Sequence, residues 1–280
     1  MEAYTDFAKV YDEFMDETPY HEWAAYISQL ISGYGISLPY GENKKDKDAD
    51  ELSEDEKLSQ ERNLVVELGC GTGRFTEEMA RLGYDMVGID NSSDMLGIAR
   101  KKLEESGLDI MYLEQDMTEL DLFCTAGCVV SVCDSINYLI EDEQILKTFE
   151  LVNNYLYPGG LFVFDFNTLH KYRDVIGDVT IAENRDDCSF IWENYFDDDS
   201  HINEYDLTVF IKEGGKESSV FRRSMETHLQ RGYTLDEMKS FIKASGMEFI
   251  TAIDADTHDE PSDESERIYV LAREQGKAHQ

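Results

Sequence analysis

The spacing of apolar side chains changes along the chain, and its first part has a helical period. Between residues 5 and 33, apolar residues recur every three or four positions, from Phe7 to Phe14 and again from Trp23 to Ile31. Such stripes are typical of helices that pack one face on a core. We therefore expect a helical segment within residues 1–40. Charged residues dominate residues 41–62, which predicts an acidic linker or insertion.

From residue 64 onward, short apolar runs alternate with helical patterns. The apolar runs predict strands at 64–68, 85–90, 109–116, 128–134 and 161–166. Helices are predicted at 74–82, from Ser92 or Ser93 to Leu103, and around 145–156. This alternation is typical of a parallel sheet with helices on its faces. The sequence "YPGG" at 157–160 predicts a turn before the last of these strands.

The spacing of apolar residues changes after Thr168. Three segments rich in aromatic and β-branched residues predict a small inserted antiparallel sheet, at 188–196, 204–211 and 219–230. A helix follows at 234–246, with Thr234 and Glu237 as a capping box, and two strands are predicted near 247–254 and 267–273. The expected fold class is α/β: a doubly wound, seven-stranded, mostly parallel sheet with an inserted small antiparallel β-sheet.

Charge and composition reduce the number of function classes that the chain could belong to. The formal net charge is -35, with a pI near 4.3, and much of the acid lies in 42–62 and 254–267. A surface this acidic repels a phosphate backbone, so we expect no nucleic-acid partner. No apolar run approaches the roughly 18 residues of a membrane span, and the first residues lack the order of a signal peptide, so we expect no membrane partner and a cytoplasmic location.

The cysteines and histidines suggest neither disulfides nor a metal site. The five cysteines include no C-x-x-C pair and mostly lie in apolar runs, so reduced thiols are expected. The six histidines are scattered, and none stands at metal-ligand spacing from another. We therefore predict no metal.

The stretch "VVELGCGTG" at 65–73 carries the candidate chemistry. Glycines in a turn between a strand and a helix let the backbone approach a ligand and point free N–H groups toward it. A nicotinamide or flavin site requires G-x-G-x-x-G, but the sixth position counted from Gly69 is Arg74. The glycines here are Gly69, Gly71 and Gly73, and Glu67 stands two residues before the first.

Four motifs in order resemble those of the class I S-adenosylmethionine-dependent methyltransferases, in particular the bacterial small-molecule type with a methyltransferase-25-like core. They are "VVELGCGTGRF", "GIDNSSDML" at 88–96, "QDM" at 115–117 and "YPGGLFVFD" at 157–165. The resemblance extends from Tyr4 to Arg273, apart from the acidic insertion. It implies a Rossmann-like methyltransferase fold and S-adenosyl-L-methionine as cofactor.

The resemblance also assigns roles to single residues. Asp90, 21 residues past Gly69, is suited to accept hydrogen bonds from both ribose hydroxyls, because a carboxylate matches a vicinal diol. Asp116 is expected to accept from the adenine amino group, Cys133 to offer its carbonyl to the ammonium group, and Glu67 to face the positive end of the cofactor. The residues expected to bind the cofactor are Tyr11, Glu67, Gly69, Cys70, Gly71, Asp90, Asn91, Met95, Gln115, Asp116, Met117 and Cys133.

The methyl acceptor is less clear from the sequence. The (D/N)-P-P-Y pattern of enzymes that methylate nucleobase or glutamine amino groups is absent, and "CDSINY" stands at 133–138 instead. We expect an in-line transfer to a small molecule, in which the protein mainly aligns the reactants. The catalytic candidates are Tyr11, Asp134 and His228. The substrate-binding candidates are Tyr4, Asn137, Tyr138, Trp192 and Arg223.

Several alternatives stay open. His228 also suits a plain polar position on a half-exposed strand, and a non-catalytic cofactor-binding or partner-regulating protein would show the same motifs. The acceptor atom, the use of a general base and the oligomeric state are not determined. The expected domains are a helical lid at 1–40, the linker at 41–62, a cofactor-binding domain at 63–170 and 232–280, and a substrate or cap subdomain at 171–231.

Overall fold

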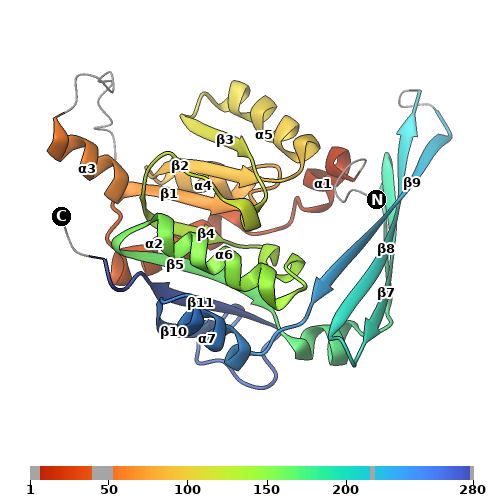
Figure 1. Ribbon diagram of the computed structural model, residues 1–280. Coiled ribbons are helices and arrows are strands. Elements are labelled where there is room, and N and C mark those ends of the chain that lie inside the picture. The colour runs from red at the N-terminus through yellow and green to blue at the C-terminus, as the bar shows by residue number, and fades with distance from the viewer. Residues whose placement is uncertain (1–6, 40–52, 215–217, 278–280) are drawn as a thin grey trace.

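The computed structural model describes residues 7–39, 53–214 and 218–277, and it contains two sheets (Figure 1). The larger sheet has seven strands in the order β10-β11-β5-β4-β1-β2-β3. Its strands are β1 Leu64–Leu68, β2 Asp85–Asp90, β3 Ile110–Glu114, β4 Ala126–Ser131, β5 Leu156–Asn167, β10 Glu248–Asp254 and β11 Arg267–Arg273. Only the pairings of β11 with β5 and β10 are antiparallel. The predicted fold class is confirmed.

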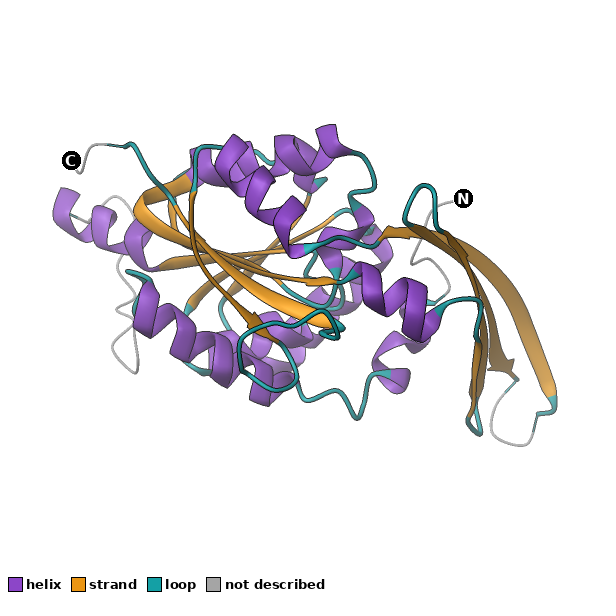
Figure 2. Cartoon of the chain, turned by 90° about the horizontal axis from the view of Figure 1, so that it is seen from below, coloured by secondary structure: helices purple, strands orange, loops and turns teal. Residues whose placement is uncertain are grey.

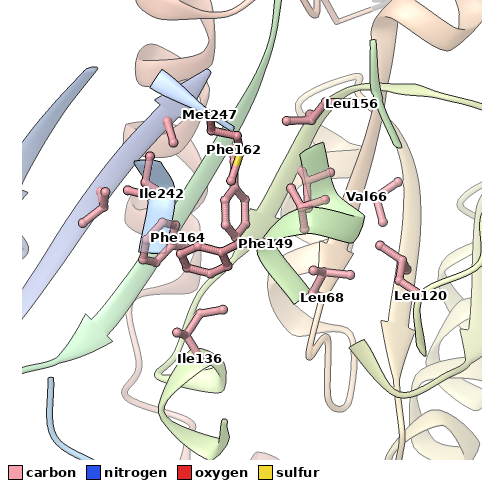
Figure 3. Close-up of a cluster of buried hydrophobic side chains, with 14 of the residues drawn as sticks. Val66, Leu68, Leu120, Ile136, Phe149, Leu156, Phe162, Phe164, Ile242 and Met247 are labelled. Carbon is pink, nitrogen blue, oxygen red and sulfur yellow. The ribbon is translucent and has the colours of Figure 1, made fainter. Parts of the chain in front are cut away.

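Helices cover both faces of this sheet because its buried strands are apolar on both sides (Figure 2). One core layer joins the sheet to α2 Tyr20–Tyr34, α4 Arg74–Arg81 and α5 Ser93–Ser106. The other joins it to α6 Asp142–Tyr155 and α7 Leu235–Ala244, and Figure 3 shows its aromatic centre at Phe149, Phe162 and Phe164. The predicted caps are present: Ser92 accepts from the Met95 N–H, and Thr234 and Glu237 form the capping box.

The order of the strands reverses beside β1, which lies between β2 and β4. The chain therefore leaves β1 and β4 toward opposite faces of the sheet. In doubly wound folds this arrangement opens a crevice at the carboxyl ends of the two strands. The glycine loop predicted from the sequence follows β1 and lies at this position.

The turn predicted at 157–160 is wrong, since these residues lie inside β5. The pairing of β4 with β5 shifts here, from Ala126 opposite Leu156 to Cys128 opposite Leu161. Three additional residues of β5 are therefore accommodated as an irregularity between two paired parts of one strand. Pro158 has no N–H for the ladder, and the Gly159 N–H is taken by a side-chain oxygen of Glu274 at 2.8 Å.

The N-terminal pattern forms two helices, α1 Ala8–Phe14 and α2. Within the segment predicted as a linker, α3 Glu54–Asn63 is helical, because Ser53 and Glu56 form a capping box at its start. None of its side chains is buried, so capping and local propensity sustain it rather than a core. Residues 41–52 of that segment lie outside the described residues.

The smaller sheet is antiparallel, in the order β6-β7-β8-β9, and projects from one end of the molecule (Figures 1 and 2). Its strands are β6 Thr180–Asn184, β7 Cys188–Asp197, β8 Ile202–Glu213 and β9 Val220–Arg231. The sequence predicted the last three but not β6, whose residues have little apolar character and are mostly exposed. The inner face of this sheet packs on α1 through Val10, Tyr205 and Leu207.

Replacing Phe149 by alanine tests the core of the larger sheet. Phe149 is fully buried, and its ring lies 5.3 Å from that of Phe162 and 5.1 Å from that of Phe164. We expect Phe149→Ala to lower the free energy of unfolding by about 3–5 kcal/mol, because it leaves a cavity. The measurement is urea denaturation. Phe123→Ala is the control, since Phe123 is 69% exposed and its loss is expected to change stability by less than about 0.5 kcal/mol.

Candidate active site

A cavity of about 330 Å³ lies at the carboxyl ends of β1, β2 and β4. Its volume falls within the range of about 300–1,000 Å³ usual for small-molecule sites. The twelve residues that the sequence assigns to the cofactor all line it: Tyr11, Glu67, Gly69, Cys70, Gly71, Asp90, Asn91, Met95, Gln115, Asp116, Met117 and Cys133. The fold therefore brings the first three motifs and the segment after β4 to one cavity, whereas residues 157–165 of the fourth motif do not line it. The role of each residue there stays a prediction.

Two glycines shape the loop after β1 for different reasons. Gly69 and Gly71 both have positive φ, +72° and +54°. A Cβ on Gly69 would lie 2.4 Å from the Ser135 Oγ, so glycine is required there for close packing against a neighbouring loop. A Cβ on Gly71 would meet no atom within 4 Å, and it would point into open space. Gly71 is thus the glycine at which a ligand has room to approach the backbone.

Asp90 ends β2 and holds the glycine loop. One carboxylate oxygen accepts from the Gly71 N–H at 2.7 Å, and the other accepts from the Ser92 N–H at 2.8 Å. Burial raises the pKa of Asp90, although these backbone bonds act against the rise. A carboxylate has about four lone-pair directions, so Asp90 retains the capacity to accept from a ligand as well.

Glu67 is the one acid of the glycine motif at 65–73, and it is buried, at 2% exposure. Its Oε2 accepts a hydrogen bond from the Thr76 hydroxyl at 2.5 Å. Burial is the main cause that raises the pKa of Glu67 to about 8, and the nearby Asp90 adds to the rise. A cationic ligand in the cavity would favour the ionised form of this carboxyl.

The chain turns sharply after β4. Cys133 and Asp134 both adopt positive φ, 60° and 54°, which is uncommon for residues with a Cβ. Asp165 of β5 fixes this corner, because its two oxygens accept from the N–H groups of Cys133 and Asp134 at 3.0 and 2.8 Å. Arg267 lies 3.8 Å from Asp165 and balances its charge. The corner sets the direction of the Cys133 carbonyl.

Helix α1 is fastened beside the cavity through Asp12. One oxygen of Asp12 accepts from the Thr72 hydroxyl at 2.6 Å, and the other lies 2.7 Å from the Lys102 Nζ. A guanidinium nitrogen of Arg74 donates to the Asp12 carbonyl at 3.3 Å. These bonds tie α1 to the glycine loop and to α5, and they place Tyr11 on the cavity lining.

The acceptor-side candidates are only partly brought together. Tyr138 lines the cavity, whereas Asn137 is fully buried and bonds the backbone of Asn167 and Arg231. The Asp134 carboxylate accepts from the side chain of Gln230 at 2.5 Å and is not part of the lining. The hydrogen bonds of Asn137 to the backbone give it a structural role at η4 Ser135–Tyr138.

The remaining candidates lie on the smaller sheet. Trp192 donates to Asn194 at 2.9 Å, and Arg223 lies 3.5 Å from Thr208, both away from the cavity lining. His228 is 2% exposed, and its Nδ1 lies 3.1 Å from the Tyr138 hydroxyl. It therefore reaches the lining through Tyr138. Tyr4 lies outside the described residues.

The sequence missed part of the lining and one acid beyond it. The additional lining residues are Thr72, Arg74, Phe75, Ile89, Thr118, Val132, Ser135, Leu139 and Gln144. Most adjoin a predicted site residue in the chain, so proximity alone would have indicated them. The acid is Glu226, whose Oε2 lies 3.4 Å from the His228 Nε2. Its position two residues before His228 on a strand was the available signal.

Across the described residues, no group of three or more His, Cys, Asp or Glu is placed to hold a metal ion. The same part of the chain contains no helix with the length and apolar character needed to cross a membrane.

Comparisons with known proteins agree on one family. A family model described as "Methyltransferase domain" matches residues 65–160. A protein of Geobacillus sp. (strain WCH70) named "putative methyltransferase" is 31% identical over 273 residues, which cover 97% of this chain and 99% of that protein. The chain thus matches this relative over nearly its whole length.

Solved structures share the fold. A S-adenosylmethionine-dependent methyltransferase from Clostridium acetobutylicum ATCC 824 superposes with a TM-score of 0.78 at 23% identity, covering 98% of this chain and all of that one. CalS10, an amino pentose methyltransferase from Micromonospora echinaspora solved with S-adenosylmethionine bound, has a TM-score of 0.66 at 15% identity, with 98% and 99% covered. At these identities the likeness concerns the fold.

The raised pKa of Glu67 predicts a dependence of stability on pH. The folded pKa of about 8 lies above the ordinary value of 4.5, so Glu67 contributes stability below pH 4.5 that is lost as the pH rises toward 8. We expect the difference in unfolding free energy, wild type minus Glu67→Gln, to decrease between pH 5 and 8 and to level off above. Urea denaturation at several pH values measures it. The exposed Glu248→Gln is the control, and a flat difference for Glu67→Gln would contradict the assignment.

Proposed function

The chain belongs to the S-adenosylmethionine-dependent methyltransferase family, and from this premise we propose that it transfers a methyl group to a small-molecule acceptor by in-line displacement. The cofactor is S-adenosyl-L-methionine, which supplies an electrophilic methyl group on a positively charged sulfur when bound. The chain contributes binding, alignment and exclusion of water.

One observation carries the proposal: residues from three separate motifs and from the turn after β4 line one cavity at the strand-order reversal, and Gly71 leaves open space there. In this proposal Asp90 accepts from the ribose hydroxyls, and Asp116 accepts from the adenine amino group. The Cys133 carbonyl, held by the corner after β4, accepts from the ammonium group. Glu67 faces the cationic end and ionises when the cofactor binds.

The acceptor is proposed to be small for two reasons. The net charge of -35 disfavours a nucleic acid. The structural relative CalS10 acts on an amino pentose according to its description, which provides an analogy through the fold. In this proposal α1 and α2 form the lid over the cofactor, and the smaller sheet forms the acceptor side. Tyr11 would then meet both reactants from the lid.

The competing proposal is a non-catalytic protein that binds the same cofactor. Both proposals expect binding, so binding alone does not separate them. Turnover does: a screen of phenols, alcohols and amines as acceptors, with S-adenosylhomocysteine formation as the readout, is expected to give product with at least one class. Acceptor-independent background in every case would favour the non-catalytic protein.

Replacing Asp90 by asparagine tests the cofactor site. We expect Asp90→Asn to weaken the binding of S-adenosylhomocysteine roughly 10- to 100-fold, because a hydrogen bond to a charged group contributes about 1.5–3 kcal/mol. Isothermal titration calorimetry measures the affinity. Asp94→Asn is the matched control, since Asp94 is an exposed acid in the first turn of α5. Equal affinities for wild type and Asp90→Asn, or no binding by the wild type, would refute the proposed site.

Replacing Asp12 by asparagine tests the lid. The change removes the ion pair with Lys102 while keeping the size of the side chain. We expect S-adenosylhomocysteine to dissociate several-fold faster, because α1 is then held less firmly against the glycine loop. Stopped-flow displacement measures this rate. Glu17→Gln, an exposed position just beyond α1, is the control, and an unchanged rate for Asp12→Asn would show that α1 does not limit release.

A further inference from the structure

Three polar side chains form a chain from the cavity into the buried face of the smaller sheet. Tyr138 stands on the cavity lining, and its hydroxyl lies 3.1 Å from the His228 Nδ1. On the far side of the imidazole, Nε2 lies 3.4 Å from the Glu226 Oε2. His228 and Glu226 are each 2% exposed. We propose that Tyr138, His228 and Glu226 are a proton relay that serves the methyl acceptor.

This inference rests on the proposed function and adds the class of acceptor to it. A group that must lose a proton on methylation needs a base, whereas a thioether or a tertiary amine does not. A relay of this kind therefore suits an acceptor that carries a hydroxyl or an ammonium group.

The relay requires one imidazole tautomer. With Glu226 ionised and able only to accept hydrogen bonds, the relay has the proton on the imidazole nitrogen that faces Glu226. That leaves the Nδ1 lone pair directed at the hydroxyl of Tyr138. Histidine is suited to proton transfer because its two nitrogens exchange donor and acceptor roles. In the relay, Nδ1 of His228 takes the proton of the Tyr138 hydroxyl.

The surrounding contacts fix the geometry of the relay. The ring of Tyr205 stacks on the imidazole at 4.8 Å, with 4° between the planes, and its hydroxyl lies 2.8 Å from that of Tyr138. The second oxygen of Glu226 accepts from the Phe7 N–H at 3.0 Å, at the start of α1. Residues of η4, of β8 and of the N-terminal helix therefore contact His228 or Glu226. A buried acid in this setting keeps its charge only with such partners.

The acceptor X–H forms a bond from X to the methyl carbon, and the pair of the carbon–sulfur bond stays with sulfur. The proton of X–H passes to the Tyr138 oxygen, and the Tyr138 proton passes to Nδ1 of His228. The resulting imidazolium is stabilised by the Glu226 carboxylate and later releases its proton to water. In these terms Tyr138 is the catalytic residue, and Glu226 is a positioning residue that acts through His228.

A structural role for the same residues makes different predictions. A network that only supports the sheet would require no particular tautomer, and its loss would lower stability without a selective effect on turnover. A relay requires a bare Nδ1 and affects the rate constant more than the affinity. These differences define the test.

The first measurement is the tautomer of His228 by NMR of 15N-histidine-labelled protein bound to S-adenosylhomocysteine, with His228→Gln to assign the resonance. We expect a neutral ring with the proton on Nε2 at pH 8, and a shift of the Nδ1 resonance in Tyr138→Phe. A proton on Nδ1, or a doubly protonated ring at pH 8, would overturn the relay. This measurement decides the relay whether or not an acceptor is methylated.

The second measurement is methyl transfer to catechol and to D-glucosamine, which offer a hydroxyl and an ammonium group. For a probe that the wild type methylates, kcat is expected to fall roughly 10²- to 10⁴-fold in His228→Gln, the range typical of lost acid–base catalysis. The affinity for S-adenosylhomocysteine is expected to stay within about twofold. Thr227→Val, next to His228 on the opposite face of β9, is the control. An unchanged kcat in both His228→Gln and Tyr138→Phe would overturn the relay.

Different results would contradict the proposed function and the proton relay. A wild-type protein that does not bind S-adenosylhomocysteine contradicts the proposed function. A protein that binds it but shows the wrong tautomer, or variants with full turnover, contradicts the relay alone.

Discussion

Buried carboxylates at the carboxyl edge of the parallel sheet constrain the loops around the cavity. Burial raises the pKa of Glu67, Asp90 and Asp165, which means that each is costly to keep ionised without donors. The donors come from the loops themselves: the glycine loop and the start of α5 bond Asp90, and the corner at 133–134 bonds Asp165. The need to satisfy these acids therefore sets the shape of the site, and the same acids suit a cationic cofactor.

Helix α1 connects the two parts of the proposed active site. Through Asp12 it bonds the glycine loop and α5, and through the Phe7 N–H it bonds Glu226 on the smaller sheet. Apolar contacts of Val10 with the same sheet add to this attachment. A movement of α1 would therefore alter the cofactor side and the relay together. In the proposed reaction, closing of the lid and positioning of His228 are one structural event.

Local sequence determined most of the elements of the larger sheet and the cofactor side of the site. The limits of β1, β2 and β11 follow from apolar runs between polar residues, and the caps at Ser92 and Thr234 follow from short-range bonding. Eleven of the twelve residues assigned to the cofactor meet in one cavity because they lie at or just after the carboxyl ends of β1 to β4, which share one edge, whereas α1 brings Tyr11 to it. In such a fold, position along the chain is enough to place them.

The acceptor side was decided by tertiary structure. Asn137 and Tyr138 are neighbours in the chain, yet packing buries the first and places the second on the cavity lining. Likewise, His228 meets Tyr138 only because the smaller sheet turns its inner face toward η4, and Glu226 then lies on the far side of His228. Contacts between residues about 90 positions apart leave no periodic signal. The sequence by itself determined the fold and the cofactor loop, because those depend on local patterning. The tertiary structure alone decided which side chains lie on the proposed acceptor side.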